Sequence, residues 1–335
     1  MIGLIDIMGL KRKINTLRRH PWIMADIVRG RDWQEIENRA GALDESEALL
    51  FATSMKKKLP TAERDPCAPL NLSKVCCVED FENVEVRQAL ADILKLNPDG
   101  LIHRKDWEWA TGILAMRRLG KLDEKCTAVG VGVGTEVMPF YLANRIGHVY
   151  ATDLYEAREW KAAAPLDFPD NPEKYAPFPY RKDALTVSRM NGTKLEFPSE
   201  SFDIAFSFSS IEHFGGRNHS GALKSLREME RVLKPGGVAV VATEYIINNK
   251  EHHEFFNERT IYSDLISKVK ALRLVEPLDL DITPRTLDTV LDFFTIDMNW
   301  DRLDIDFKKQ HPLILLRVRN ILFTSIMLVF QKTKV

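Results

Sequence analysis

The segment from Ala128 to Glu136, AVGVGVGTE, constrains the fold of this chain more than any other. The apolar residues at its start predict a short buried strand, and the residues that follow it, up to Ile146, have helical periodicity. Glycines at such a junction let the backbone approach a ligand where a side chain would collide. The N–H groups that begin the next helix are free to bind an anion. The pattern therefore indicates a ligand-binding turn in an α/β sheet, and Thr135 is the expected N-cap of the helix.

The sequence downstream alternates between strands and helices. We expect strands at 127–131, 148–152, 185–190, 202–208 and 238–243, and later ones near 272–277 and 321–330. A helix before residue 238 has Leu223, Leu226, Met229 and Leu233 on one face and is expected to end at the Pro-Gly-Gly of 235–237. This alternation predicts a doubly wound α/β sheet with right-handed crossovers.

The first hundred residues have a different texture. They contain helical-looking segments, broken by a polar, proline-containing stretch at 59–73, and show no strong strand alternation. We therefore expect a helical N-terminal extension over 1–100 and one domain over 101–335. The first twenty residues mix apolar and basic side chains, which is compatible with contact to an anionic membrane face or a protein partner. Docking of that helix on the body of the same chain is the interpretation we favour.

Composition restricts the class of protein. The 47 Lys and Arg balance 48 Asp and Glu, which gives no reason to expect a nucleic-acid partner. The four cysteines form no Cys-x-x-Cys pair, so we expect reduced thiols. The apolar start lacks a leading positive charge and a cleavage site, and the late apolar run at 312–330 contains Arg317 and Arg319. We expect a soluble cytoplasmic protein, with any peripheral membrane contact made through residues 1–20. The oligomeric state stays open.

Asp153 ends the second expected strand, about 20 residues after the glycines. In nucleotide-binding sheets an acid at this distance accepts hydrogen bonds from ribose hydroxyls; the alternative for Asp153 is a helix cap. The dinucleotide fingerprint G-x-G-x-x-G does not fit, because its last position falls on Thr135 or Val137. A nicotinamide oxidoreductase is therefore a distant alternative.

Three ordered motifs carry a resemblance to a known family. They are the glycine turn, the segment MNGTKLEFPSESFDIAFSFSSIEHF (190–214), and the segment 223–243 with REMERVLKPGGVAVVAT. In this order they resemble the class I S-adenosylmethionine-dependent methyltransferases, and the chain is similar to the methyltransferase type 11 kind that modifies small molecules and glycans in bacteria. The resemblance covers roughly residue 102 to the C-terminus. It implies a Rossmann-like, seven-stranded methyltransferase sheet with S-adenosylmethionine as the cofactor.

The resemblance also assigns cofactor-binding residues. The methionine part of the cofactor would lie on the glycine turn, the ribose on Asp153, the adenine on Asn191, and the sulfonium beside the end of the fourth strand. The complete set is Gly130, Gly132, Gly134, Thr135, Glu136, Asp153, Leu154, Asn191, Gly192, Ser207 and Phe208. Two positions depart from the family. Gly130 stands at the usual acidic position, and Glu136 stands at the third glycine, where it meets either the cofactor's ammonium group or only the helix dipole. Asn191 replaces the more usual Asp, and its oxygen can still accept a hydrogen bond.

Glu212 and His213 follow the fourth strand and are the candidate catalytic residues. A base helps when the methyl acceptor is an unactivated hydroxyl, and we expect His213 to remove the proton; the alternative is a residue that only lines the pocket. These two residues with His252 and His253 have no recognised ligand spacing, so no metal is predicted. The aromatic loop at 165–181 is either a substrate lid or a loop packed down by its own rings.

We expect an S-adenosylmethionine-dependent enzyme that methylates an oxygen of a sugar, glycan or other small-molecule acceptor. The alternative is a catalytically silent protein that binds S-adenosylmethionine and acts as an assembly partner through its N-terminal helices.

Overall fold

One mixed sheet forms the centre of the molecule. The computed structural model describes residues 13, 16–60, 64–94, 101–156, 163–296, 299 and 302–333. In this part of the chain the sheet has nine strands, in the order β3-β2-β1-β4-β5-β9-β8-β7, with β6 paired to β9. The strands are β1 Thr127–Val131, β2 His148–Asp153, β3 Leu185–Arg189, β4 Phe202–Phe208, β5 Leu233–Ile246, β6 Leu272–Leu274, β7 Leu291–Asp292, β8 Leu316–Val318 and β9 Ile321–Lys332.

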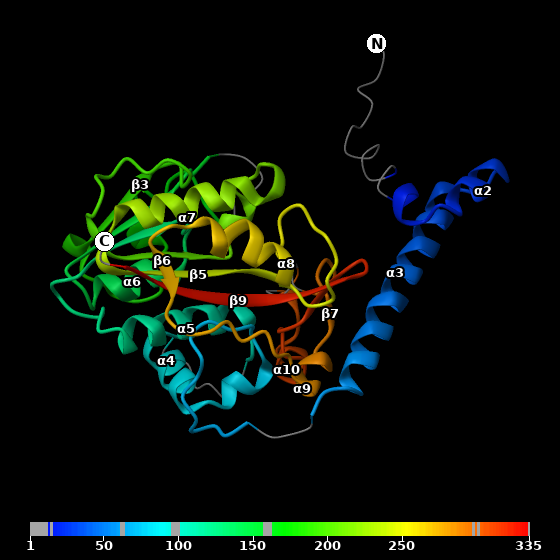
Figure 1. Cartoon of the computed structure of the whole chain (residues 1–335), viewed down its shortest axis with the longest axis horizontal. Coiled ribbons are helices and arrows are strands. Elements are labelled where there is room, and N and C mark those ends of the chain that lie inside the picture. The colour runs from blue at the N-terminus through cyan, green and yellow to red at the C-terminus, as the bar shows by residue number, and fades with distance from the viewer. Residues whose placement is uncertain are drawn as a thin grey trace, which may run out of the picture.

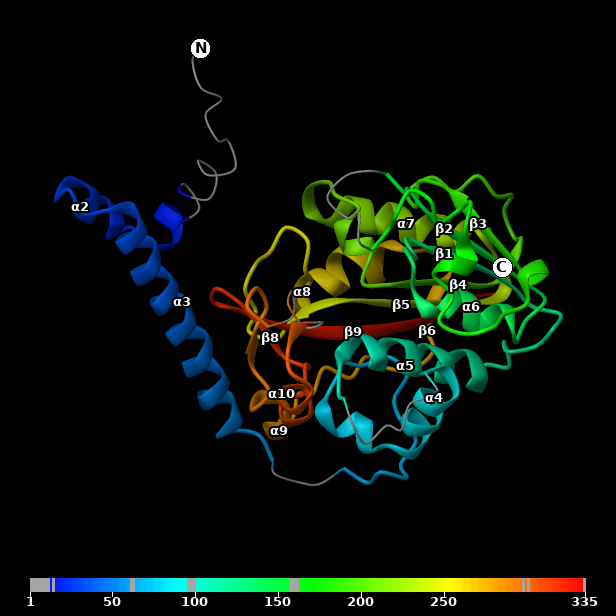
Figure 2. The same cartoon turned by 180° about the vertical axis from the view of Figure 1, so that it is seen from behind.

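Helices cover both faces of this sheet. The longer ones are α3 Trp33–Lys56, α4 Val84–Leu94, α5 Arg104–Arg118, α6 Val137–Ala143 and α7 Ser220–Val232. The shorter ones are α2 Ile23–Val28, α8 Glu258–Thr260, α9 Pro284–Leu287, α10 Ile305–Gln310, η1 Val78–Glu82, η2 Pro172–Lys174, η3 Lys182–Ala184, η4 Ile211–His213, η5 Arg217–His219, η6 Ile261–Leu265 and η7 Ile266–Lys268. Figures 1 and 2 show α4 and α5 below the sheet and α7 above it.

The sheet is doubly wound because its first five strands are parallel and are joined by crossovers. β1 pairs with β2 and β4, β2 with β3, and β4 with β5, all in parallel. β9 returns antiparallel along β5, from Val238 opposite Gln331 to Ile246 opposite Phe323. Both strands are buried over most of their length. Strands covered on both faces read as continuous apolar runs, which is the pattern expected for 238–243.

The glycine turn after β1 has the backbone that only glycine adopts easily. Gly132 and Gly134 have φ angles of +67° and +50°. The N–H of Gly132 donates to the carbonyl of Thr152 at 2.8 Å, so the turn folds over the end of β2. A Cβ at Gly134 would run into the carbonyl oxygen of Ala163, far inside van der Waals contact. The close approach at Gly134 is thus made by the chain itself.

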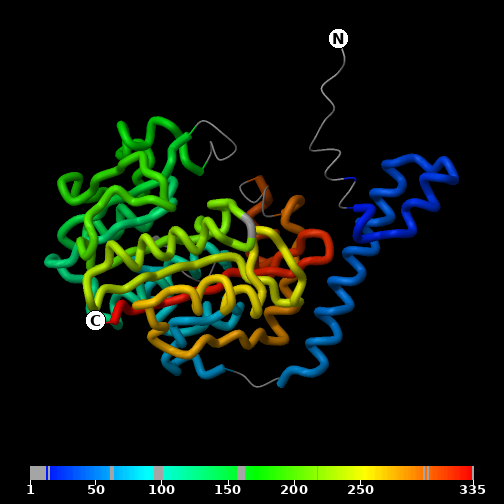
Figure 3. Tube along the Cα trace, turned by 45° about the horizontal axis from the view of Figure 1, so that its top comes forward, coloured from blue at the N-terminus to red at the C-terminus, as the bar shows by residue number. Residues whose placement is uncertain are grey.

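The N-terminal hundred residues pack in two different ways. Figure 3 shows α2 and the first turns of α3 projecting from the body, whereas the later turns of α3 pack on it through the buried Ala48 and Ala52. Residues 70–93, in contrast, share the main core with α5: Val86, Ile93 and Trp107 are all completely buried in one cluster. The N–H of Cys76 donates to the carbonyl of Ser325 on β9 at 2.8 Å. We therefore propose that the boundary between extension and domain lies near residue 60 and not at residue 100.

A buried ion pair ties this segment to the body. The Lys74 ammonium donates to Asp80 Oδ2 at 2.5 Å, and the indole N–H of Trp107 donates to the same oxygen at 2.9 Å. Both charged side chains are almost fully buried. Burial alone would lower the pKa of Lys74, but Asp80 raises it above its ordinary value. Asp80 thus joins η1 to the first turns of α5.

The predicted fold class is confirmed, with several local differences. The sheet has nine strands and not seven, because the short β7 and β8 extend its edge and β6 adds to β9. The Pro-Gly-Gly of 235–237 lies inside β5, where the pairing with β4 is irregular, since α7 already ends at Val232. Glu136, and not Thr135, is the N-cap of α6. Residues 11, 12, 14 and 15 of the first helical-looking segment lie outside the described residues. No helix within the described ranges is long and apolar enough to cross a membrane.

Asp80→Asn should destabilise the protein by about 3–5 kcal/mol, because it leaves the Lys74 ammonium buried without a counter-charge. Urea unfolding monitored by circular dichroism measures this loss. The matched control is Asp288→Asn, which breaks the exposed pair of Asp288 with Lys56 and should cost less than about 1 kcal/mol. Equal losses in the two variants would contradict the assigned role of Asp80.

Gly134→Ala should also lower stability, by more than its backbone angle alone explains. Gly120 has a φ of +66°, and a Cβ placed on it would have nothing within 4 Å, so Gly120→Ala measures the left-handed strain, about 1–2 kcal/mol. Gly134→Ala adds a collision with backbone and should cost roughly 1–3 kcal/mol more. The difference is measured by urea unfolding of both variants, and a difference of zero would disprove the tight contact at Ala163.

Candidate functional site

The carboxyl ends of four parallel strands meet at one edge of the sheet. Gly132 follows β1, Asp153 ends β2, Asn191 follows β3 and Ser209 follows β4. Ligands of open α/β sheets bind outside this edge, at the point where the strand order reverses. In this sheet the order reverses between β1 and β4, so the edge brings together the turn and the residues after β4.

Asp153 holds the glycine turn. Its Oδ2 accepts from the N–H of Gly134 at 2.9 Å, and its Oδ1 accepts from the N–H of Leu154 at 2.7 Å. Burial raises the pKa of Asp153, while these N–H groups lower it. The Leu154 side chain is 47% exposed beside it. Each carboxylate oxygen keeps a further lone pair, so Asp153 can accept from ligand hydroxyls while it holds the turn.

Asn191 and Gly192 lie at the expected edge but make contacts within the chain. The Asn191 Oδ1 accepts from the N–H and the hydroxyl of Thr193, at 2.9 and 2.8 Å, in a local turn. A Cβ at Gly192 would lie 2.5 Å from the ring of Phe214, and one at Gly132 would lie 2.9 Å from the same ring. The ring of Phe214 thus fills the space beside both glycines, and its packing requires glycine at each of them.

The remaining predicted cofactor residues are largely built into the sheet. The hydroxyl of Ser207 donates to the carbonyl of Val131 at 2.7 Å, and Phe208 is buried against Gly112. The side chains of Phe206 and Val133 fill the space that a Cβ on Gly130 would occupy. Contacts of these three residues with a ligand would have to come from their backbone. The N–H of Thr135 donates to the carbonyl of Ala163 at 2.9 Å.

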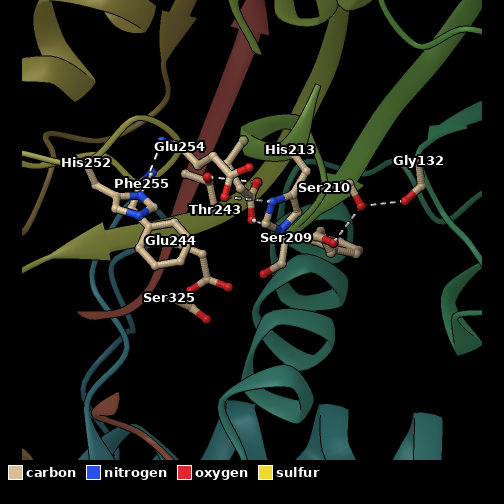
Figure 4. A network of polar contacts seen from close by, with 12 residues as sticks. Gly132, Ser209, Ser210, His213, Thr243, Glu244, His252, Glu254, Phe255 and Ser325 are labelled. Carbon is tan, nitrogen blue, oxygen red and sulfur yellow. Dashed lines mark hydrogen bonds and ion pairs between the residues drawn. The ribbon is translucent and has the colours of Figure 1, made fainter. Parts of the chain in front are cut away.

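Two serines that the sequence analysis did not single out join the strand ends. Ser209 has a φ of +46°, a strained backbone for a residue with a side chain, and its hydroxyl donates to Glu108 Oε1 at 2.8 Å. The hydroxyl of Ser210 donates to the carbonyl of Gly132 at 2.5 Å. The only signal in the sequence is the hydroxyl-rich run at the end of the fourth strand. Figure 4 shows Ser210 bonded to Gly132, and the backbone N–H of His213 donates to the carbonyl of Ser210 at 3.0 Å.

His213 lies between two carboxylates. Its Nδ1 is 3.5 Å from Glu254 Oε2, and its Nε2 is 3.9 Å from Glu212 Oε1. The Glu212 side chain is fully buried and its Oε2 accepts from the hydroxyl of Thr243 at 3.0 Å, whereas the imidazole is 24% exposed. Figure 4 shows His213 and Glu254 facing each other above β5. The imidazole is therefore held by acids on both sides and still reaches solvent.

The carboxylates change how His213 titrates. Burial alone would lower its pKa, but the hydrogen bond to Glu254 and the charges on Glu212 and Glu244 raise it above 6.5. Burial also raises the pKa of Glu212. The sequence did not reveal that Glu254 would be the neighbour of His213, so this raised pKa could not be predicted from it. His252 does not compete for a proton, since burial lowers its pKa to about 4.

A second ionic group lies under the same edge. Lys105 Nζ donates to Glu136 Oε1 and to Glu108 Oε2, both at 2.9 Å. Arg104 Nη1 donates to both oxygens of Glu244, at 2.8 and 2.9 Å. All of these groups come from the first turns of α5, the start of α6 and the end of β5. Among these acids, only Glu136 was predicted from the sequence as a site residue.

The aromatic loop at 165–181 is packed on the body. Phe168 is fully buried, and its ring lies 6.0 Å from that of Phe140 and 5.5 Å from that of Tyr155. This contact favours the second of the two alternatives for the loop, a segment packed down by its own rings. Within the described residues, no group of three or more His, Cys, Asp or Glu side chains is arranged to hold a metal ion.

Residues 129–241 match the family described as a methyltransferase domain. This stretch is about a third of the chain and includes β1 to β4, the turn and most of β5. No curated protein sequence gives a significant match.

Several solved structures are similar in fold. The YcgJ protein from Bacillus subtilis is 14% identical, with a TM-score of 0.42 over 67% of this chain and 99% of its own. The [4+2]-cyclase SpnF is 16% identical, with a TM-score of 0.41 over 79% of this chain and 99% of its own. Phosphoethanolamine N-methyltransferase 2 from Haemonchus contortus is 15% identical, with a TM-score of 0.42 over 68% of this chain and 53% of its own. Likenesses this distant do not bear on activity or substrate.

The matched residues contain the glycine turn, Asp153 and the end of β4, which are the positions that carry the resemblance in the sequence. Residues 129–241 of this chain therefore match a methyltransferase domain, which agrees with the resemblance to the class I S-adenosylmethionine-dependent methyltransferases.

Proposed function

We propose that this protein transfers the methyl group of S-adenosylmethionine to an oxygen atom of a sugar, glycan or other small-molecule acceptor. The observation that carries the proposal is the position of His213: its imidazole lies between Glu212 and Glu254, and its backbone N–H donates to Ser210, whose hydroxyl donates to the glycine turn. A histidine fixed by carboxylates and open to solvent is the arrangement of a general base. Hydroxyl acceptors need such a base more than neutral amines do.

The side chains at this edge have the hydrogen-bonding groups that S-adenosylmethionine would need. Asp153 has lone pairs to spare for ribose hydroxyls. Glu136 has one buried oxygen, Oε2, without a well-formed hydrogen bond in the described part of the chain, which suits a ligand donor. Phe214 occupies the space beside Gly132 and Gly192, so we expect its ring to shift when a ligand enters. When bound, S-adenosylmethionine supplies a methyl group already activated by its sulfonium.

The protein's own contribution is then position and proton removal. A methyl transfer needs the acceptor oxygen held in line with the methyl carbon, and such positioning accounts for most of the acceleration. His213 would accept the proton that the acceptor hydroxyl loses when the methyl group moves from the sulfur to the acceptor oxygen and S-adenosylhomocysteine is left as the product. The carboxylates of Glu212 and Glu254 stabilise the imidazolium that results, since each lies within 4 Å of the ring.

The second candidate function is a silent protein that binds the cofactor and acts as an assembly partner through its N-terminal helices. It is favoured by the α2 and α3 arm, which exposes apolar side chains to solvent: Met24 at 56%, Val28 at 83% and Leu50 at 69%. Exposed apolar groups of this kind mark interaction surfaces when they adjoin one another. Formation of S-adenosylhomocysteine in a screen of acceptors separates the two functions, because a silent binder forms none.

Asp153→Ala should weaken binding of S-adenosylmethionine by roughly 1.5–3 kcal/mol, the size of hydrogen bonds to a charged group. Isothermal titration calorimetry measures the change. The variant also frees the N–H of Gly134, so circular dichroism must accompany the titration. The control is Asp167→Ala on the exposed side of the aromatic loop, which should bind normally. Unchanged affinity in folded Asp153→Ala would assign the ribose to another group.

His213→Ala should lower turnover by about 10²- to 10⁴-fold, the usual contribution of a general base, and leave cofactor affinity unchanged. Turnover is measured as formation of S-adenosylhomocysteine with the acceptor found in the screen. A variant with full turnover would exclude His213 as the base.

The pH profile gives an independent check. His213 acts as a base only when deprotonated, so the rate should fall as pH drops through its raised pKa, above 6.5. Glu254→Gln removes a group that raises this pKa, so the acid limb of kcat/KM should move to lower pH. A limb that stays in place, or moves to higher pH, would show that His213 is not the titrating group.

A further inference from the structure

The ion pair of Lys105 and Glu136 lies directly beside the glycine turn. All three hydrogens of the Lys105 ammonium have acceptors within reach: Glu136 Oε1 and Glu108 Oε2 at 2.9 Å each, and the carbonyl of Phe208 at 3.4 Å. Lys105 therefore bridges α5, the start of α6 and the end of β4. Because all of its donors are engaged, Lys105 positions neighbouring groups and has no donor left for a ligand.

Glu136 is only half satisfied by this arrangement. Its Oε1 accepts from Lys105, while its Oε2 is buried and makes no well-formed hydrogen bond within the described residues. The indole N–H of Trp109 interacts with this carboxylate but likewise makes no well-formed hydrogen bond there. A buried carboxylate oxygen left in this state costs free energy that a ligand donor can recover. Glu136 is two residues from Gly134, so a ligand lying on the turn passes within reach of it.

The charges around Glu136 favour a cationic group. The connected set contains two bases, Arg104 and Lys105, and three acids: Glu108, Glu136 and Glu244. One negative charge is therefore left without a protein partner in this set. A buried, unbalanced carboxylate attracts an ammonium more strongly than it attracts a neutral hydroxyl or amide.

We propose that Glu136 binds the α-amino group of the methionine end of S-adenosylmethionine, and that Lys105 is the positioning residue that fixes Glu136 for this contact. The proposal rests on the proposed function, because it takes the glycine turn as the cofactor site. It explains why an acid stands where the family has its third glycine: the cofactor's ammonium is received by a side chain carried on α6 and braced from α5.

The titration of Glu136 agrees with this role. Burial raises its pKa to about 7, while Lys105 and Trp109 lower it and Glu108 raises it further. An ammonium group of the ligand, once bound beside Glu136, should therefore keep this carboxylate ionised. Without Lys105 the pKa of Glu136 should rise. As the pH is lowered, the affinity for a cationic ligand should then begin to fall at a higher pH than in the wild-type protein.

Two ligands separate this contact from the rest of the cofactor site. S-adenosylmethionine carries the amino-acid end, and 5′-methylthioadenosine has the same nucleoside and sulfur but lacks that end. In calorimetry, Glu136→Gln should weaken S-adenosylmethionine binding by about 10- to 100-fold, as for a lost charged hydrogen bond. It should change 5′-methylthioadenosine binding by less than about threefold, the scatter of neutral substitutions. If this variant does not fold, Glu136→Asp serves with the same pair of ligands.

Variants of Lys105 test the positioning role. Lys105→Met should weaken the binding of S-adenosylmethionine but not of 5′-methylthioadenosine, and should move the pH dependence of S-adenosylmethionine binding to higher pH. Lys105→Arg should retain much of the wild-type affinity. The matched control is Glu82→Gln, which breaks the pair of Glu82 with Arg285 on η1 and α9 and should affect neither ligand.

Equal weakening of both ligands by Glu136→Gln would overturn the proposal, because the residue would then only support the turn. A pH dependence that Lys105→Met leaves unmoved would overturn the role of Lys105. Wild-type protein that binds neither ligand would overturn the proposed function itself, and the proposal with it. Titrating the wild-type protein first separates a failure of the proposed function, in which neither ligand binds, from a failure of the Glu136 contact alone.

Discussion

The hydrogen bonds of the buried Glu108 carboxylate hold the parts of the candidate site together. Its side chain has no exposed surface, yet it binds partners from three elements. Oε1 accepts from the hydroxyls of Ser209 and Ser325, at 2.8 and 2.5 Å, and Oε2 accepts from Lys105. One side chain of α5 thus fixes the end of β4, the middle of β9 and the lysine that reaches the glycine turn. A buried charge is tolerable only when it is hydrogen-bonded this fully.

This arrangement explains why the site and the N-terminal segment are inseparable. α5 brings Glu108, Lys105 and Arg104 under the carboxyl edge, and Trp107 on the same helix is held by Asp80. Asp80 in turn neutralises Lys74, whose carbonyl accepts the N–H of Met327 on β9 at 2.8 Å. Residues 70–93 are therefore part of the scaffold of the site, and the part that extends from it is confined to the α2 and α3 arm.

The two ionic groups at the edge divide the chemistry between them. Lys105 and Glu136 lie on the side of the glycine turn, where a positively charged cofactor would be received. His213, Glu212 and Glu254 lie beyond β4, where the acceptor would give up its proton. Ser209 and Ser210 connect the two sides, one to Glu108 and the other to the carbonyl of Gly132. Burial raises the pKa of Glu136 and of Glu212, because it disfavours the charged carboxylate, whereas the neighbouring carboxylates raise the pKa of His213 against its burial.

The sequence by itself determined the parallel part of the sheet and the residues at its edge. Apolar runs, the glycines and Asp153 depend on local rules of strand burial, backbone freedom and spacing, so β1 and β4 were predicted with their observed bounds. The sequence could not supply partners that are distant along the chain. Glu254 is 41 residues from His213, and Lys105 is 31 residues from Glu136; only the crossing of α5 and the loop after β5 over the same edge brings them together. Only tertiary structure shows what covers the helix at 84–94, since Val86 and Ile93 have the periodicity of any amphipathic helix. Whether such a helix forms a separate extension or part of the core depends on which surface covers its apolar face, and that surface is α5.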